Sequence, residues 1–243
     1  MDETMPIERD VVDLEASVAE VAIALFAPGT VDATLRQIVR LAEHAVEGCD
    51  GAGVMVVADG VVTTAAASND FVVAIDDLQI AADEGPCVDA CRTGDTFYAQ
   101  DLLTESRWPS FAPAGAAAGV RSILTFALST GSPSALNLYG GLPAAFGAMD
   151  RASGHLFATL ARLALDSAAK RAAGEKRADD LMEALRTREV IGQAQGILME
   201  RERITGYQAF SVLRQASQRM NLKLRDIAEA LVETGESPDT DAR

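Results

Sequence analysis

The sequence predicts an α+β fold, in which an antiparallel sheet covered by helices precedes a long helix and two shorter ones. Two observations predict it. Two strand-like runs over 51–67 meet at Asp59-Gly60, a dipeptide that favours the type I′ turn of a β-hairpin. Apolar residues before and after this region recur at helical spacing. Strands flanked by helices on this scale are typical of α+β domains.

Two helices are expected before the sheet. The first covers about 11–25, with apolar residues three and four positions apart at Val11, Leu14, Val18, Val21 and Leu25. Pro28-Gly29 ends it. The second covers about 31–47 and carries on one face Leu35, Ile38, Val39, Ala42 and Val46. Two helices cannot bury both of these faces alone, so they need a sheet or a partner chain.

The segment after the hairpin alternates short helices with strands. We expect helices near 69–80 and 86–93, a strand at 96–99, a loop and short helix over 107–119, and strands at 121–129 and 133–140 joined by a turn at Thr130-Gly131. Residues 146–201 are almost entirely compatible with a helix. Their leucine stripe starts at Leu156, weakens over 167–178 and resumes at Leu181. Two packed helices with a polar connection and one continuous helix both remain open.

The last two helices have defined ends. Thr205 and Gln208 fit a capping box, in which each side chain bonds a free backbone N–H of the first turn. That helix runs to about Met220 and is broken at Asn221. The final helix runs to Thr234, with Gly235 as its C-cap.

The net charge of −15 is unevenly distributed. Residues 1–169 hold 23 acidic residues against 8 arginines and no lysine, whereas residues 170–243 hold 13 acidic and 13 basic residues. This pattern excludes a uniformly basic nucleic-acid binder but leaves room for a locally basic one. It also indicates two units with different tasks.

Several other protein classes are excluded. The acidic N-terminus predicts no signal peptide, and no run of about 18 apolar residues predicts a membrane span. Three cysteines are too few for a secreted disulfide scaffold and favour the reducing cytoplasm. With two histidines and none of the common zinc, phosphate-loop or hydrolase motifs, neither a metal site nor a catalytic residue is predicted.

Residues 181–235 carry a long pattern of distinctive positions: Arg188, Ile191, Ala194, Gly196, Leu198, Met199, Ala209, Phe210, Leu213, Arg214, Ala216, Leu224 and Ala228. At this spacing they resemble the ANTAR family of output domains. The resemblance implies a three-helix bundle that acts as a dimer, binds paired hairpins in nascent mRNA and so causes transcription antitermination. One position departs from the family pattern, because Gln195 stands where Lys is usual. A neutral glutamine there affects one of the expected contacts with an RNA phosphate.

The candidate RNA-binding residues are Arg188, Ala194, Gln195, Gly196, Arg214, Gln218, Arg219, Lys223 and Arg225. Cations suit phosphates, and glutamines offer neutral hydrogen bonds to loop bases. For any single arginine the alternative is a solvated face with acidic partners. With the family match we favour RNA contact for Ala194 over packing inside the bundle, and Gly196 stays open between the two. Of the aromatic residues Tyr207 and Phe210, we expect Phe210 in the core.

A second resemblance rests on EGPCVDAC (84–91), DL and RWPSFAP (101–113), GVRSILTFAL (119–128) and ALNLYG (135–140). With these pieces, residues 31–165 resemble a GAF domain of the actinobacterial kind found ahead of such output domains. The resemblance implies a six-stranded antiparallel sheet with a pocket on one face. It also implies helices that pair into a dimeric four-helix bundle.

The sensed signal is not identified by the sequence. The candidate pocket residues are Cys87, Tyr98 and Trp108, with packing as the alternative for each. His44 and His155 fall on peripheral helices, which disfavours haem, and Cys87 has no neighbouring His to support a bilin. No cofactor is therefore predicted. We interpret Cys87 and Cys91 in the first place as small buried apolar residues. A thiol-dependent sulfoxide reductase of GAF fold is a remote alternative that requires a low-pKa thiol.

These patterns predict five segments: a disordered N-terminus at 1–10, a sensor with its dimerisation helix at 11–165, a helical linker at 166–180, an RNA-binding domain at 181–235 and a disordered tail at 236–243. We expect a cytoplasmic homodimer, joined through the N-terminal and connecting helices, that binds RNA and neither DNA nor membrane. It is not expected to be an enzyme. The main alternative is a ligand-sensing dimer whose C-terminal helices bind another protein.

Overall fold

The computed structural model describes residues 18–128 and 132–236. The chain divides into two compact units, here called unit 1, which ends at Ala172, and unit 2, which begins at Ala173. Val11, Leu14 and the Thr130-Gly131 turn lie outside the described residues, as do the expected N-terminal segment and all but the first residue of the tail.

Unit 1 contains a five-stranded sheet within its described residues. The strands are β1 (Gly51–Ala58), β2 (Val61–Ala67), β3 (Phe97–Ala99), β4 (Ser122–Ala127) and β5 (Ser134–Gly140). They lie in the order β2-β1-β5-β4-β3, and every neighbouring pair is antiparallel. The predicted α+β class is confirmed, with five described strands where the resemblance implied six.

The turn between β1 and β2 has the predicted chemistry. Asp59 and Gly60 both have positive φ, 52° and 79°, as a type I′ turn requires. Only residues that tolerate the left-handed region fit both positions, so this dipeptide sets the register of the hairpin.

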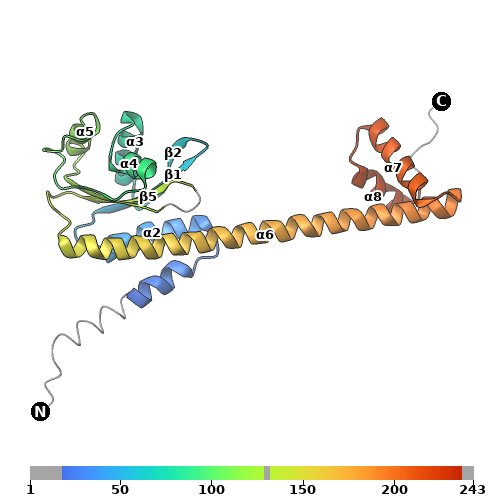
Figure 1. Cartoon of the computed structure of the whole chain (residues 1–243), viewed down its shortest axis with the longest axis horizontal. Helices are drawn as coiled ribbons and strands as arrows, with labels where there is room; N and C mark the ends of the chain where they lie inside the picture. Colours follow the sequence, from blue (N-terminus) through green and yellow to red (C-terminus); the bar gives the residue numbers. More distant parts are fainter. Residues whose placement is uncertain (1–17, 129–131, 237–243) are drawn as a thin grey trace, which may run out of the picture. The chain divides into compact units, whose positions relative to one another are not determined.

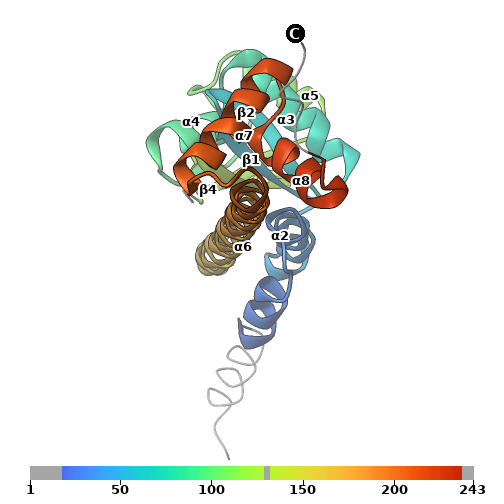
Figure 2. The same ribbon diagram turned by 90° about the vertical axis from the view of Figure 1, so that its right-hand side faces the viewer.

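Helices cover both faces of the sheet (Figure 1). They are α2 (Val31–Ala45), α3 (Asp70–Ala82), α4 (Pro86–Thr93), α5 (Phe111–Ala117) and α6 (Ala148–Glu202), preceded by a helix described over 18–26. On one face, α2 and the first part of α6 lie side by side, and Figure 2 shows the same pairing from the end. On the other face lie α3, α4 and α5.

Alternation along β5 separates the two faces. Leu136 and Leu138 enter the core beneath α2 and α6. Asn137 and Tyr139 point to the opposite face, where Tyr139 joins the core beneath α3 and α5. All seven residues of β5 are buried, since helices cover the sheet on both sides.

The connecting segment is one helix. α6 runs without a break through the polar stretch 167–178, so the structure adopts the continuous alternative. That stretch contains no proline and is rich in Ala, Lys, Arg and Glu, all good helix formers. Every residue from 170 to 186 is exposed, including Leu181 and Leu185. A helix exposed on all sides lacks the packing that stabilises most helices.

Unit 2 is a three-helix unit built from the end of α6, α7 (Gly206–Met220) and α8 (Leu224–Thr234). The capping box of Thr205 and Gln208 is present as predicted. Asn221 and Gly235 adopt the left-handed conformation at the ends of the two helices. The core is apolar and consists of Ala194, Leu198, Ala209, Leu213, Ala216, Ile227, Ala228 and Leu231.

Candidate functional site

One side of α7 presents four exposed side chains at helical spacing. Tyr207 is 87% exposed and Phe210 is 38% exposed, and Arg214 and Gln218 continue the same row. The expectation that Phe210 lies in the core is wrong. Ala209, Leu213 and Ala216 occupy the inner face of α7, which turns Phe210 outward. We call Tyr207, Phe210, Arg214 and Gln218 the α7 row.

The predicted small-residue pair separates in the structure. Ala194 has no exposed surface and packs in the core of unit 2. The prediction that Ala194 contacts RNA directly is therefore wrong, and the alternative of packing inside the bundle holds. Gly196 is exposed, and a Cβ there would meet no atom within 4 Å. Gln195 is half-buried, and its Nε2 donates to the Gly206 carbonyl at 3.0 Å, which ties α6 to the start of α7.

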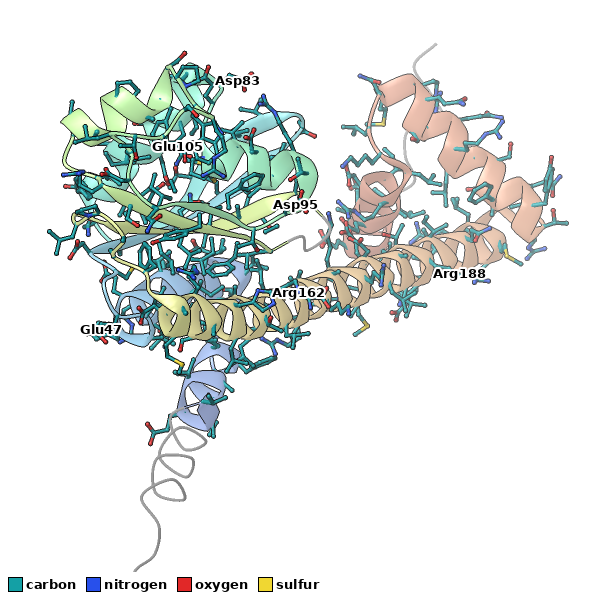
Figure 3. The ribbon with its side chains drawn as sticks, turned by 60° about the vertical axis from the view of Figure 1, so that its left-hand side comes forward. Glu47, Asp83, Asp95, Glu105, Arg162 and Arg188 are labelled. Carbon is teal, nitrogen blue, oxygen red and sulfur yellow. The ribbon has the colours of Figure 1, made fainter. Side chains whose placement is uncertain are left out.

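The predicted cations differ in their surroundings. Arg188 on α6 is exposed (Figure 3), as are Arg219 and Lys223 at the end of α7 and the start of α8. Arg225 instead donates to Glu183 at 2.6 Å and lies 3.5 Å from Asp226 and 3.8 Å from Glu229. These acidic partners raise the pKa of Arg225, chiefly through the Glu183 hydrogen bond.

Arg225 therefore fits the alternative interpretation of a solvated face with acidic partners. Three neighbouring carboxylates compete with a phosphate for its guanidinium and repel an incoming anion. Among the nine sequence candidates, the structure thus leaves an exposed set consisting of Arg188, Gly196, Arg214, Gln218, Arg219 and Lys223.

The three predicted pocket residues of unit 1 do not share one pocket. Cys87 and Trp108 lie on the α3–α5 face, where Trp108 Nε1 donates to Asp89 at 2.7 Å. Tyr98 packs edge-on against Phe146 on the α2–α6 face. Successive residues of a strand face opposite sides, so Phe97 rather than Tyr98 meets Trp108, at 6.1 Å between ring centroids.

A buried polar network on the α3–α5 face was not predicted. Asp76 of α3 has no exposed surface. Its carboxylate accepts from Thr64 at 2.9 Å, from Asn137 at 3.4 Å and from the Tyr139 hydroxyl. Burial raises the pKa of Asp76 to about 6, against the opposing effect of these hydrogen bonds.

The network extends from α3 to α4 and β4. Gln79 Nε2 donates to the Tyr139 hydroxyl at 2.9 Å, and its Oε1 accepts from the Cys87 backbone N–H at 3.0 Å. Thr125 of β4 donates to Asn137 at 3.0 Å. The network therefore connects α3 and α4 with strands β2, β4 and β5, and each member forms a hydrogen bond with another.

Two glycines leave the space that the side chains of Asp76 and Gln79 occupy. A Cβ at Gly53 would lie 2.9 Å from an Asp76 carboxylate oxygen, and one at Gly85 would lie 2.3 Å from Gln79 Oε1. Glycine inside a strand signals a close approach, so Gly53 was the available sequence signal. Gly53 alone could not identify the side chain that approaches it, because Asp76 lies in a helix, where an acidic residue normally faces water.

The cysteines are free thiols buried to different degrees. Burial raises the pKa of Cys87, which also loses access to water, and it raises the pKa of Cys49 to about 12. A hydrogen bond with Cys87 lowers the pKa of Cys91. Among the described residues no group of three His, Cys, Asp or Glu side chains could hold a metal ion. None of the helices within the described residues combines the length and the apolar composition that a membrane span requires.

Family models match both units. The GAF domain model matches residues 29–166, and the ANTAR domain model matches residues 179–232. No curated protein matches the chain.

Solved structures resemble this chain at low sequence identity. The chromophore-binding domain of a bacteriophytochrome from R. palustris has a TM-score of 0.52 and 10% identity, with 65% of this chain and 63% of that chain covered. A free methionine-R-sulfoxide reductase from Neisseria meningitidis has a TM-score of 0.49 and 15% identity, with 63% and 88% covered. At 10% identity, the likeness to the bacteriophytochrome domain concerns the fold alone.

Proposed function

Because this chain belongs to the GAF domain family, whose model spans more than half of it, and carries an ANTAR domain behind, we propose that it is a signal-responsive RNA-binding regulator of transcription antitermination. GAF domains are sensors, and ANTAR domains are RNA-binding regulatory domains. We keep as part of this proposal the boundaries expected from the sequence: a sensor at 11–165, a linker at 166–180 and the RNA-binding domain at 181–235. As a binder of nascent mRNA, the protein acts in the cytoplasm.

The observation that carries this proposal is the α7 row. RNA hairpin loops expose unstacked bases, and proteins hold them by stacking on aromatic side chains and by hydrogen bonds to base edges. Tyr207 and Phe210 supply exposed rings, and Arg214 supplies a cation one turn further on. Gln218 adds a neutral donor and acceptor. The exposed Arg188, Arg219 and Lys223 suit the phosphates that flank such a loop.

Two copies of the chain are proposed to act together through their helices. Val21, Leu156 and Leu160 line a groove between the helix over 18–26, α2 and α6. Ile23 of the same N-terminal helix is 72% exposed. The uncovered part of α6, with Leu181 and Leu185, also needs a partner. A dimer brings two RNA-binding units to two hairpins, which raises avidity without new contacts.

The charge distribution supports selectivity. Residues 1–169, which include the sensor, carry the entire net negative charge, whereas residues 170–243 are neutral overall. Acidic surface repels RNA non-specifically, so binding then depends on loop bases that fit the α7 row. Neutralising acids on the sensor surface is expected to raise non-specific RNA binding in low salt; unchanged binding assigns that charge to solubility alone.

RNA binding is tested with the full chain and fluorescent RNA carrying one or two hairpins. Tyr207→Leu keeps an apolar side chain but removes the stacking ring, and we expect about tenfold weaker binding to two-hairpin RNA. Arg214→Gln is expected to weaken binding and to reduce its salt dependence by about one charge. Lys176→Gln removes a charge from exposed α6 outside the α7 row and serves as the matched control. Equal affinities of all three variants contradict the assignment.

The dimer is tested separately. Leu156→Glu places a charge in the apolar groove and is expected to yield monomers in sedimentation and to abolish the preference for two hairpins over one. A monomeric variant that keeps this preference contradicts the proposed pairing. A protein-binding output, the alternative function, predicts no salt-dependent RNA binding by any form of the chain.

The remote enzyme alternative has no support from Cys87. A thiol needs thiolate character and access to substrate, and Cys87 is fully buried with a raised pKa. Cys87→Ser is therefore expected to leave RNA binding intact. Loss of a sulfoxide reductase activity in that variant would instead support the enzyme.

A further inference from the structure

Three sulfur-containing side chains share one buried cluster of unit 1. Cys87 and Cys91 lie one helical turn apart on α4, and Met55 lies on β1. They pack together with Ala90 and Ala135. Met55 and Cys87 have no exposed surface, and Cys91 is 8% exposed. None of the three has a role in the proposed RNA binding.

The periodicity of helix and strand brings these side chains to one place. Residues four positions apart lie on the same face of a helix, so Cys87 and Cys91 both face the sheet from α4. Val54 joins the core beneath α2 and α6, and strand alternation therefore turns Met55 toward α4. The partner of Met55 on β5 is Ala135, whose methyl group takes up little of the space under α4.

The two thiols lie within reach of one another. They share a hydrogen bond, and Cys87 forms a second one with the side chain of Asn137 on β5. Metal–sulfur bonds of about 2.3 Å place two sulfur ligands of a three-coordinate ion about 4 Å apart. Two thiols joined by a hydrogen bond are close to that separation, so an ion can replace the shared proton with small side-chain movements. The exposed edge of Cys91 gives the ion a path from solvent.

The chemistry of the cluster limits the class of ion. Thiolate and thioether sulfurs are soft ligands, which suit Cu(I), zinc or iron–sulfur clusters. Structural zinc and iron–sulfur clusters take four protein ligands. Within the described residues, no third His, Cys, Asp or Glu joins the two cysteines in a group that could hold a metal ion. Two thiolates and one thioether instead match Cu(I), which forms stable bonds with two or three sulfur ligands.

We propose that Cys87, Cys91 and Met55 together bind one Cu(I) ion. Both thiols release their protons to solvent, so two Cu–S bonds replace two S–H bonds and no group changes its oxidation state. The Met55 thioether is a neutral third ligand. The positive charge of the ion offsets one thiolate, and the Asn137 amide donates to the sulfur of Cys87, which opposes the repulsion by the Asp76 carboxylate. The proposal concerns unit 1 alone and does not rest on RNA binding.

The test titrates the reduced full chain with Cu(I) in the absence of oxygen, in competition with a chromogenic Cu(I) chelator. We expect one copper per chain and the ultraviolet charge-transfer band of Cu(I) bound to thiolate. X-ray absorption is expected to show sulfur ligands alone. One copper per two chains, a nitrogen or oxygen ligand, or no competition with the chelator overturns the proposal. Displacement of the copper by equimolar Zn(II) also overturns it, because the site then has the four ligands that zinc requires.

Conservative variants separate metal binding from packing. Met55→Leu keeps an apolar side chain of similar volume but lacks the thioether, and is expected to bind Cu(I) about tenfold more weakly. Cys91→Ser keeps the size but removes a soft ligand, with an expected loss of at least about a hundredfold. Met149→Leu at an exposed position of α6 and Cys49→Ser beside the α2–α6 core make the same changes outside the cluster and are expected to bind normally. Thermal unfolding confirms that each variant is folded, and undiminished binding in folded Met55→Leu or Cys91→Ser contradicts the site.

Discussion

The two units differ in where their polar side chains lie: unit 1 buries a set of them, whereas unit 2 carries them on its surface. All seven buried polar side chains of the described residues lie in unit 1, where Asp76, Gln79 and Asn137 satisfy one another around Tyr139. Unit 2 has an apolar core and carries its aromatic rings and cations outside. A closed network specifies one interior geometry, since each lost partner is costly. An exposed row leaves its groups available to another molecule, so the two units suit sensing and binding respectively.

The largest effect is expected from breaking the closed interior of unit 1. Gly85 has φ +134° and would place a Cβ 2.3 Å from Gln79, so Gly85→Ala is expected to cost at least about 3 kcal/mol. Gly94→Ala is the control, because Gly94 also has positive φ but a Cβ there meets no atom within 4 Å. It should cost about 1–2 kcal/mol. Urea unfolding measures both, and equal costs contradict the close packing of Gln79.

A core deletion in unit 2 tests whether the units are independently stable. Leu213 is fully buried in the apolar core, and Leu213→Ala is expected to cost about 3 kcal/mol. Since unit 1 shares none of these core residues, its methyl and aromatic NMR signals should keep their native positions while unit 2 unfolds earlier. A single transition that shifts for the whole chain shows that the units unfold together.

The buried carboxylate gives unit 1 an unusual pH dependence. The pKa of Asp76 is raised by burial from 3.8 to about 6, so the folded state holds this proton more tightly than the unfolded state does. Its contribution to stability is therefore complete below pH 4 and is lost as the pH rises through 6, by about 3 kcal/mol. Asp76→Asn removes that contribution. The difference between wild-type and variant unfolding free energies, measured from pH 4 to 7, should show this slope; a constant difference contradicts it.

The smallest effect is expected at the α6–α7 contact of unit 2. Gln195→Ala removes the hydrogen bond to the Gly206 carbonyl and should cost about 1 kcal/mol of unit 2 stability. Gln193→Ala on the exposed side of α6 is the control and should cost less. If Gln195 acts only within the unit, affinity for RNA measured well below the unfolding temperature stays unchanged. A clear loss of affinity would return Gln195 to the RNA surface.

Much of the fold was predictable because its signals are local. The Asp59-Gly60 turn and the Thr205–Gln208 capping box depend on residues within one turn of each other, and both form as expected. The α+β order of elements follows from the same kind of pattern. Charge also separates the sensor segment from the C-terminal unit without reference to structure.

The sites depended on contacts that sequence spacing does not reveal. Whether Phe210 faces out and Ala194 faces in was decided by which side of each helix meets the rest of unit 2. Tyr98 lies outside the predicted pocket, because the alternation of side chains along β3 places it on the α2–α6 face of the sheet. Asp76 meets Tyr139 across 63 positions of sequence, and only the packing of α3 on β5 brings them together. The sequence thus determined the elements and their ends, whereas burial, a property of long-range packing, decided which side chains can act.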